Sequence, residues 1–394
     1  MSFFSHVQLI PEDPILSIPP LFAADKHPNK VNLGVGAYRD AEGHPLVLNS
    51  VRKAEHYLFS QNLNNEYLPM DGDPDFCLES LTLALGEGSL HFPRVFTAQT
   101  VGGSAALKVA GDFLIRQFPQ AKIQLSHPSW SNHRHIFTKC GFEIDSYPYM
   151  QNHHFDFEGM CSAIKQMPKG DIILLHACCH NPSGTSPTFD QWVQISQLIL
   201  EQKLFVLFDM AYQGFGAGLD EDAAALRYFA DQNHEMAVTI SHSKNFGLYG
   251  ERVGLLAFFM KASETVDKVG SQIKSTIRSI YSSPPAHGAR IVKTVLQSEE
   301  LTAEWKEELK NMRHRIIEMR KALTAELQSK ESSSDFTFIQ EQEGLFSMTG
   351  LNREQVSLLR AEHGIYMPPS GRINVAGLNS QNVKIVADAI HEVI

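Results

Sequence analysis

Short apolar runs alternate with longer stretches of helical patterning along most of this chain of 394 residues. The runs have the length of buried strands and lie at 94–100, 122–126, 171–177, 204–208 and 237–241. Strands that alternate with helices favour a largely parallel sheet in an α/β fold. Because the chain exceeds the size at which single cores stop growing, we expect about two domains.

A long amphipathic helix follows this alternation. Between residues 301 and 327 apolar residues recur at steps of three and four, which is one face of a helix. At ~1.5 Å per residue such a helix spans roughly 40 Å and could link two domains. Three serines at 332–334 follow, and strand signals then appear at 336–339 and 373–375. We therefore expect a second, smaller domain in this region.

Composition excludes several classes of partner. Lys and Arg total 34 against 44 Asp and Glu, and the net charge of -10 argues against nucleic acid or an anionic membrane as the main partner. No apolar run approaches membrane-spanning length, and residues 11–14 interrupt the early apolar stretch, so we expect neither a membrane span nor a signal or transit peptide. The five cysteines form no disulfide framework and suit a reducing cytoplasm.

Lys244 lies in the segment SHSKNFGLYGERVG at 241–254. A lysine amine that forms a Schiff base with pyridoxal phosphate needs small hydrogen-bonding neighbours, a cation for the phosphate and a closely approaching backbone. Ser241, Ser243, Gly247 and Arg252 are residues of these kinds. A surface lysine in a polar loop is the alternative interpretation, and the other segments decide between the two.

An acid and a phenol follow the apolar run at 204–208. Asp209 ends this run and Tyr212 comes three residues later, and parallel sheets place ligands at such strand ends. Asp209 could pair with a protonated pyridine nitrogen, because a buried positive charge needs an anion. Tyr212 could donate to the ring oxygen of the cofactor. A helix N-cap aspartate beside a core tyrosine would have the same sequence.

Gly102, Gly103 and Ser104 stand between a predicted strand and a helical pattern. A helix beginning there would present free amides to a phosphate, and glycine would permit close approach. Ser104 could both cap the helix and donate to an anion. A plain strand-to-helix turn is the alternative.

The segment HACCHNPSG at 176–184 could suggest a metal site. Neighbouring strand residues point to opposite faces, so Cys178 and Cys179 would not converge on one zinc ion, and no second ligand pair has finger-like spacing. We therefore expect no metal. Residues 181–184 predict a tight turn that leaves the Asn181 amide free to donate to a ligand oxygen.

Three further side chains could bind an aromatic, anionic ligand. Trp130 lies in a polar loop and could stack on an aromatic ring, although a packing tryptophan fits equally well. Arg278 and Arg372 could each hold one carboxylate through a bidentate pair, whereas surface arginines are the alternative.

In this order and at these separations the segments resemble the class I aminotransferases, and among them the aspartate-specific members most closely. The resemblance runs from DPIL at 13–16 to SGRINVAGL at 370–378, and CCHNPSG and SHSKNFGLYGERVG are its most specific parts. It implies the fold of type I pyridoxal-phosphate-dependent transferases, a mostly parallel sheet flanked by helices with a smaller α+β domain.

The resemblance also implies how the chain is divided. Residues 1–46 would form an N-terminal arm and part of the small domain, 47–312 the large cofactor-binding domain, and 313–394 the rest of the small domain. The arm, around Phe3 and Phe4, would pack on the other subunit of a homodimer.

The resemblance implies a role for each residue of the cofactor site. Lys244 would carry pyridoxal phosphate as an aldimine and move a proton during a ping-pong reaction that passes through pyridoxamine phosphate. Asp209 would pair with the pyridine nitrogen, while Tyr212 and Asn181 would contact the ring oxygen. The other cofactor contacts would come from Gly103, Ser104, Trp130, Ser241 and Arg252, and from Tyr67 supplied by the neighbouring subunit.

Two arginines would hold the substrate. Arg372, helped by Gly36, Trp130 and Asn181, would bind the α-carboxylate, and Arg278 from the partner chain would bind the side-chain carboxylate. Two guanidiniums suit a dicarboxylate, because an unpaired buried charge costs several kcal/mol. The implied reaction transfers the amino group of L-aspartate to 2-oxoglutarate, giving oxaloacetate and L-glutamate.

Two alternatives to this function stay open. Ser104 and residues 281–283 look as much like the aromatic branch of the family, whose members act on tyrosine and phenylalanine and also keep both arginines. Residues 244–249 match the aspartate branch more closely. A non-catalytic binding protein on the same scaffold is the second alternative, since fold alone never proves function.

Overall fold

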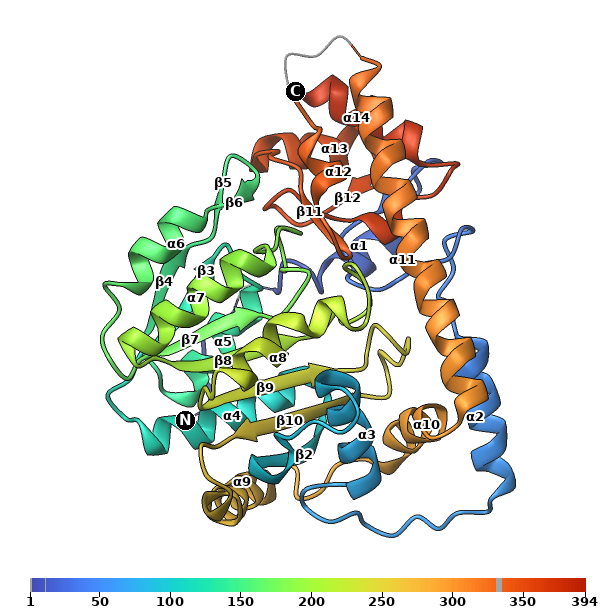
Figure 1. The fold of residues 1–394 in the computed structure, drawn as a ribbon. Coiled ribbons are helices and arrows are strands. Elements are labelled where there is room, and N and C mark those ends of the chain that lie inside the picture. Colours follow the sequence, from blue (N-terminus) through green and yellow to red (C-terminus); the bar gives the residue numbers. More distant parts are fainter. Residues whose placement is uncertain (1, 11, 331–334) are drawn as a thin grey trace.

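A seven-stranded sheet crosses the larger part of the computed structural model, which describes residues 2–10, 12–330 and 335–394 (Figure 1). The strand order is β2-β10-β9-β8-β7-β3-β4. The strands are β2 (Val95–Val101), β3 (Ile123–His127), β4 (Ile144–Pro148), β7 (Ile172–His176), β8 (Phe205–Met210), β9 (Met236–Ser241) and β10 (Val253–Phe259). Neighbouring strands are parallel except around β10, which is antiparallel to β2 and β9. The mostly parallel sheet is confirmed.

Both faces of this sheet are covered by helices, which explains why its central strands are apolar along their whole length. In β7, Ile172 and Leu174 pack into one core cluster with α4 (Gly102–Gln117), while Ile173 and Leu175 pack into the other. The remaining helices of this part are α2 (Asn49–Ser60), α3 (Pro74–Leu85), α5 (Ser131–Cys140), α6 (Phe157–Ile164), α7 (Phe189–Gln202), α8 (Ala224–Asp231), α9 (Val266–Ile280) and α10 (Ala286–Leu296).

The long helix predicted for 301–327 is confirmed as α11 (Glu299–Gln328). Figure 1 shows it in orange, running from beside α2 and α10 to a group of C-terminal helices. Its buried residues include Trp305, Leu309, Met312 and Ile316, the apolar face that the periodicity indicated. The three serines at 332–334 lie outside the described residues.

The C-terminal part joins the two ends of the chain. β1 (Val31–Asn32) pairs in parallel with β12 (Ile365–Tyr366), so the N-terminal segment lies against the C-terminal block. The other elements of this part are α1 (Ile18–Ala24), α12 (Phe338–Glu341), β11 (Phe346–Met348), α13 (Arg353–His363), β13 (Arg372–Asn374) and α14 (Val383–Val393). A small hairpin of β5 (Met150–Gln151) and β6 (His154–Phe155) belongs to the sheet domain.

Within the described ranges, no helix is both long and apolar enough to cross a membrane.

The strand predicted at 336–339 is wrong, because this segment begins helix α12. Asp335 accepts hydrogen bonds from the backbone N and the hydroxyl of Thr337, at 2.8 and 2.7 Å. Such a local aspartate turn competes with extended backbone and starts a helical turn. The prediction at 373–375 overlaps β13 and is confirmed for its first two residues.

Candidate active site

A cavity of about 250 Å³ opens where β7, β8 and β9 end, facing the C-terminal part of the chain. Eleven of the thirteen predicted site residues line it, although they come from segments spread over most of the sequence. They are Gly36, Gly103, Ser104, Trp130, Asn181, Asp209, Tyr212, Ser241, Lys244, Arg252 and Arg372. The carboxyl edge of a parallel sheet is where such folds bind ligands.

Lys244 projects into this cavity from the turn that follows β9. Its Nζ lies 4.7 Å from the centre of the Tyr212 ring. Burial lowers the pKa of Lys244 to about 8, an effect that Asp209 opposes and Arg252 reinforces. A substantial fraction of the amine is therefore neutral, and nucleophilic, at mildly alkaline pH.

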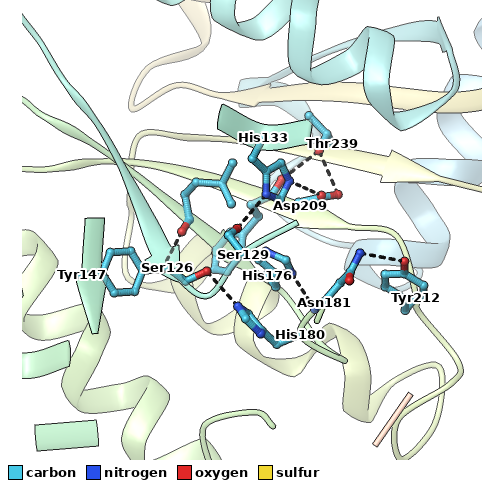
Figure 2. A network of polar contacts seen from close by, with 12 residues as sticks. Ser126, Ser129, His133, Tyr147, His176, His180, Asn181, Asp209, Tyr212 and Thr239 are labelled. Atoms are coloured by element: carbon cyan, nitrogen blue, oxygen red, sulfur yellow. Dashed lines mark hydrogen bonds and ion pairs between the residues drawn. The ribbon is translucent and has the colours of Figure 1, made fainter. Parts of the chain in front are cut away.

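Asp209 is held as an anion at the end of β8. Figure 2 shows His133 pointing at it, and His133 Nε2 donates to Asp209 Oδ2 at 2.9 Å. Thr239 lies near the other carboxylate oxygen, at 3.5 Å. Burial alone would raise the pKa of Asp209, but the hydrogen bond and charge of His133 outweigh it and leave the pKa below its ordinary value. This buried, ionised carboxylate is suited to pair with a cationic ring nitrogen.

His176 is a neutral neighbour of this carboxylate. Burial lowers the pKa of His176 to about 3. The backbone N–H of Asn181 donates to His176 Nδ1 at 3.2 Å, so the ring proton sits on Nε2. Within the described ranges that Nε2 has no hydrogen-bond partner, which leaves it free for a ligand or water.

A strand-to-helix turn and an arginine form a cradle for an anion. Helix α4 begins at Gly102, and its N-cap residue Val101 provides no side-chain cap, so the first amides of the helix remain free. Arg252 Nη1 donates to Tyr249 O at 2.9 Å and lies 3.4 Å from Ser243 Oγ. The helix end and the guanidinium approach closely, because a Cβ on Gly102 would stand 2.5 Å from Arg252 Nη2.

Ser104 and Gly103 both lie in this strand-to-helix turn. Ser104 does not cap the helix as predicted, because α4 starts two residues earlier and Ser104 lies inside its first turn. Its position on the cavity wall still allows it to donate to an anion. Gly103 lies where a Cβ would meet Ser241 Cβ at 3.2 Å, so this glycine packs closely against the end of β9.

Arg372 lines the cavity from strand β13. It is only 4% exposed, its Nη2 donates to Gly34 O, and its guanidinium carbon lies 4.2 Å from the ring centre of Phe346. Burial lowers the pKa of Arg372 to about 10, so the side chain remains charged at neutral pH. In the part of the chain that the structure describes, its Nε has no partner. A buried guanidinium with free donors is a site for a carboxylate.

Asn181 and Tyr212 lie side by side in Figure 2, with Asn181 Nδ2 3.5 Å from the Tyr212 hydroxyl. Burial raises the pKa of Tyr212 above its ordinary value, so the phenol stays protonated and can donate. Among the described residues, Asn181 Oδ1 has no partner. Trp130 borders the same cavity, and its ring meets the His133 ring edge-on at 5.1 Å.

Tyr67 and Arg278 do not line this cavity. Tyr67 is 92% exposed and Arg278 is exposed near the end of α9. Phe3 and Phe4 are exposed as well. These four are the residues expected to act on a second subunit of a homodimer.

The reason given against a metal at Cys178 and Cys179 is wrong. Strand β7 ends at His176, and Cys179 has a positive φ of 49°, so the two side chains no longer alternate across a sheet. Their sulfurs and an oxygen of Asp222 lie within 4.8 Å of one another. The Asp222 oxygens, however, accept backbone N–H bonds from 214, 216 and 217 at 2.8–2.9 Å, so this carboxylate already organises its own loop.

Several cavity residues were missed by the sequence analysis. Ile15, Leu107, Tyr249 and Phe346 line the cavity, and His133 holds Asp209. His133 and Asp209 stand 76 residues apart, and neither their spacing nor their neighbours indicate the pairing. His133 does lie within HPSWSNH, which was singled out for Trp130 alone.

Comparisons with known proteins agree with this geometry. A model of the family "Aminotransferase class I and II" matches residues 28–390. The aspartate aminotransferase of Escherichia coli K12 is 45% identical over 99% of this chain and 100% of that protein. Two solved structures are also similar over their whole lengths. An aromatic-amino-acid aminotransferase from Burkholderia pseudomallei, covalently bound to pyridoxal phosphate, is 45% identical with a TM-score of 0.97 and full coverage of both chains.

The second structure is the cytoplasmic aspartate aminotransferase of Saccharomyces cerevisiae, 39% identical with a TM-score of 0.96 over 99% of this chain and 98% of that one. The chain belongs to the class I and II aminotransferase family.

Proposed function

We propose that this protein is a pyridoxal-phosphate-dependent aminotransferase that moves the amino group of L-aspartate to 2-oxoglutarate, giving oxaloacetate and L-glutamate. The observation that carries the proposal is the meeting of Lys244, Asp209 and Arg372 in one cavity. An amine of lowered pKa, a buried anion and a buried cation with free donors are the groups that this chemistry requires. The aspartate aminotransferases among the relatives support the choice of substrate.

The cavity residues fit pyridoxal phosphate. The free amides of α4, Ser104, Ser241 and Arg252 would hold the phosphate, and Trp130 would lie against the ring. Asp209 would face the pyridine nitrogen, while Tyr212 and Asn181 would donate to the ring oxygen. When bound, this cofactor supplies an aldehyde that takes up an amino group and a ring that withdraws electron density from the substrate's α carbon.

The chain's own residues then orient the substrate and move its proton. Arg372 would hold the α-carboxylate with help from Gly36, Trp130 and Asn181, which fixes the α carbon relative to Lys244. Lys244 Nζ, with a pKa near 8, would accept the proton of that carbon and deliver it to the former aldehyde carbon of the cofactor, on the other side of the transferred nitrogen. The ionised carboxylate of Asp209 would favour the protonated form of the cofactor's ring nitrogen.

We further propose that the enzyme is a homodimer with shared active sites. Tyr67 would reach the phosphate and Arg278 the side-chain carboxylate of a substrate in the neighbouring subunit. The outward position of both residues, and of Phe3 and Phe4, supports this arrangement. The pairing of β1 with β12 supports the proposed division into a large domain at 47–312 and a small domain made of 1–46 and 313–394. A cytoplasmic location is proposed with it.

Product analysis tests the proposed reaction. Purified protein supplied with pyridoxal phosphate should form equal amounts of oxaloacetate and L-glutamate from L-aspartate and 2-oxoglutarate. A protein that binds the cofactor but makes neither product from any amino donor would instead be a binding protein on an aminotransferase scaffold.

An aromatic aminotransferase is the second candidate. The specific observation in its favour is that the Burkholderia pseudomallei aromatic-amino-acid aminotransferase matches this chain with 45% identity, the same value as the Escherichia coli aspartate aminotransferase. Ile15, Leu107 and Phe346 also give the cavity apolar walls. Formation of phenylpyruvate from L-phenylalanine at a rate similar to that of oxaloacetate would favour this candidate.

The pH dependence of cofactor capture follows from the pKa of Lys244. Because burial lowers that pKa from 10.5 to about 8, the neutral amine is already half formed near pH 8. In cofactor-free protein, the rate of pyridoxal phosphate addition should rise about tenfold per pH unit up to that point and then level off. Stopped-flow absorbance measures this rate. A rate that still rises steeply between pH 9 and 10.5 would show that Lys244 is not the desolvated amine described here.

Gly102→Ala should weaken phosphate binding, because the added Cβ would displace the Arg252 guanidinium. Gly88→Ala is the matched control, since Gly88 has a similar φ of +67° but nothing within 4 Å of the Cβ position. Both changes should cost about 1–2 kcal/mol of stability through left-handed backbone. Only Gly102→Ala should raise the dissociation constant of pyridoxal phosphate, by about tenfold or more. Equal affinities for pyridoxal phosphate in the two variants would contradict the proposal that Gly102 and Arg252 form the phosphate site.

A further inference from the structure

A chain of buried polar side chains flanks Lys244 on both sides and is not part of the cavity. Ser80 Oγ lies 2.7 Å from His242 Nε2, and His242 Nδ1 lies 3.3 Å from Asn245 Oδ1. All three side chains are at most 1% exposed. Ser80 belongs to α3, 162 residues before His242, so this link ties the lysine turn to a separate helix.

The direction of each hydrogen bond follows from the chemistry of the groups. Asn245 Oδ1 can only accept, so His242 carries its proton on Nδ1 and donates it. His242 Nε2 is then a lone-pair acceptor, and the Ser80 hydroxyl donates to it. Burial lowers the pKa of His242 to about 4, which keeps the ring in this neutral form at neutral pH.

Aromatic packing keeps the imidazole ring and the lysine turn in place. The His242 ring meets Phe76 and Phe246 edge-on, at 5.9 and 5.3 Å between ring centres. Phe246 in turn stacks on Trp305 of α11 at 4.4 Å. Trp305 Nε1 donates to the backbone carbonyl of Asn245 at 2.7 Å. The residues on either side of Lys244 are therefore anchored to α3 and α11, while its own amine is left free.

We propose that Ser80 and His242 are positioning residues for Lys244, holding the turn at 242–246 so that the amine stays aimed into the cofactor cavity. The proposal rests on the proposed role of Lys244 as the cofactor lysine. It adds two residues that touch neither substrate nor cofactor, because neither lines the cavity. A side chain as flexible as lysine gains most from such an anchor, since misplacement by about 1 Å can cost 10²-fold in rate.

The test compares two serines in equivalent environments. Ser196 Oγ lies 2.8 Å from His234 Nε2, and both residues are buried, but this pair belongs to α7 and the loop before β9. Ser80→Ala and Ser196→Ala each remove one buried serine–histidine hydrogen bond and should lower the Tm by similar amounts. Hydrogen exchange of the backbone amides at 241–249 is measured in both cofactor-free variants, together with the dissociation constant for pyridoxal phosphate.

We expect Ser80→Ala alone to speed exchange at 241–249 and to raise the dissociation constant, each by about tenfold. Equal exchange and equal affinity in the two variants would overturn the proposal. If wild-type protein did not join pyridoxal phosphate at Lys244, the proposed function would fail, whereas the exchange comparison would still decide whether Ser80 anchors the turn.

A double variant separates positioning from stability. Ser80→Ala with His242→Phe replaces both partners of the Ser80–His242 hydrogen bond by apolar groups, so no unpaired Nε2 is left, although Asn245 Oδ1 loses its donor. The double variant should recover part of the lost Tm and keep the faster exchange and weaker cofactor binding. Recovery of all three properties would mean that packing alone places Lys244, and this result would contradict the proposal.

Discussion

Lys244→Ala is expected to abolish amino transfer and leave the fold intact. No other group of this cavity can both join the cofactor and move a proton at the α carbon, so steady turnover should fall by at least ~10⁴-fold. The pKa of Lys244 lies near 8 in the folded chain, below its unfolded value of 10.5, so the unfolded chain binds more protons between these pH values. The charged, buried amine therefore costs stability at pH 7, and its removal should keep or raise the Tm.

Activity and thermal unfolding of the same preparation check both halves of this expectation. Lys244→Arg serves as the control, because it retains a positive charge but cannot capture the cofactor aldehyde. Both variants should be inactive. Turnover of either variant at more than about one hundredth of the wild-type rate would remove Lys244 from its assigned role.

Arg278→Gln is expected to change the substrate preference. A dicarboxylate would lose the partner of its side-chain carboxylate, at a cost of about 2–5 kcal/mol, whereas phenylalanine has no such carboxylate. The kcat/KM for L-aspartate should fall by roughly 10²–10³-fold while that for L-phenylalanine changes little. Arg278→Lys, which keeps the charge but not the bidentate geometry, should lie in between. Equal losses of kcat/KM for both substrates would contradict the proposal that Arg278 binds the side-chain carboxylate of a dicarboxylate.

Mixing the Lys244→Ala and Arg278→Gln variants tests whether the active sites are shared. If Arg278 acts in the neighbouring subunit, a mixed dimer of Lys244→Ala and Arg278→Gln chains contains one site with both wild-type residues. Half of randomly paired dimers are mixed, so about a quarter of wild-type aspartate activity should return. The unmixed variants and a mixture that is never unfolded and re-paired are the controls. Absence of recovery in re-paired dimers would place Arg278 in its own subunit's site or outside any site.

Much of the sheet could be predicted because parallel strands covered on both faces are apolar without interruption. β7 and β8 show this pattern, and the predicted ranges differ from theirs by at most two residues. β4 lies at the sheet edge, where three of its five residues are exposed and only Tyr147 is buried, so its composition does not mark it as a strand. β10 is as apolar as its neighbours but was not among the predicted strands, and its antiparallel direction depends on the connection after β9, which local patterning does not reveal.

The residues of the site were recognisable where function imposes a local motif. Lys244, Arg252 and Asn181 stand in specific segments, and all three line the cavity. His133 and His242 also stand in such segments, but nothing there indicates their partners Asp209 and Ser80, because these pairs form between distant parts of the chain. Phe346 stands in no such segment. The argument that Cys178 and Cys179 point away from each other failed for a different reason. It assumed that side chains alternate between the two faces of a strand, but β7 ends at His176.

A single-turnover titration with L-aspartate and, separately, with L-phenylalanine tests the proposed function most directly. Cofactor-loaded protein is mixed with each amino acid in the absence of any oxo acid, and the loss of the cofactor's visible absorbance is followed against concentration. We expect fast loss with L-aspartate and a response to L-phenylalanine that is weaker by at least about tenfold in rate per concentration. Comparable responses would assign the protein to the aromatic branch, and no response to either amino acid would contradict an aminotransferase function for this cavity.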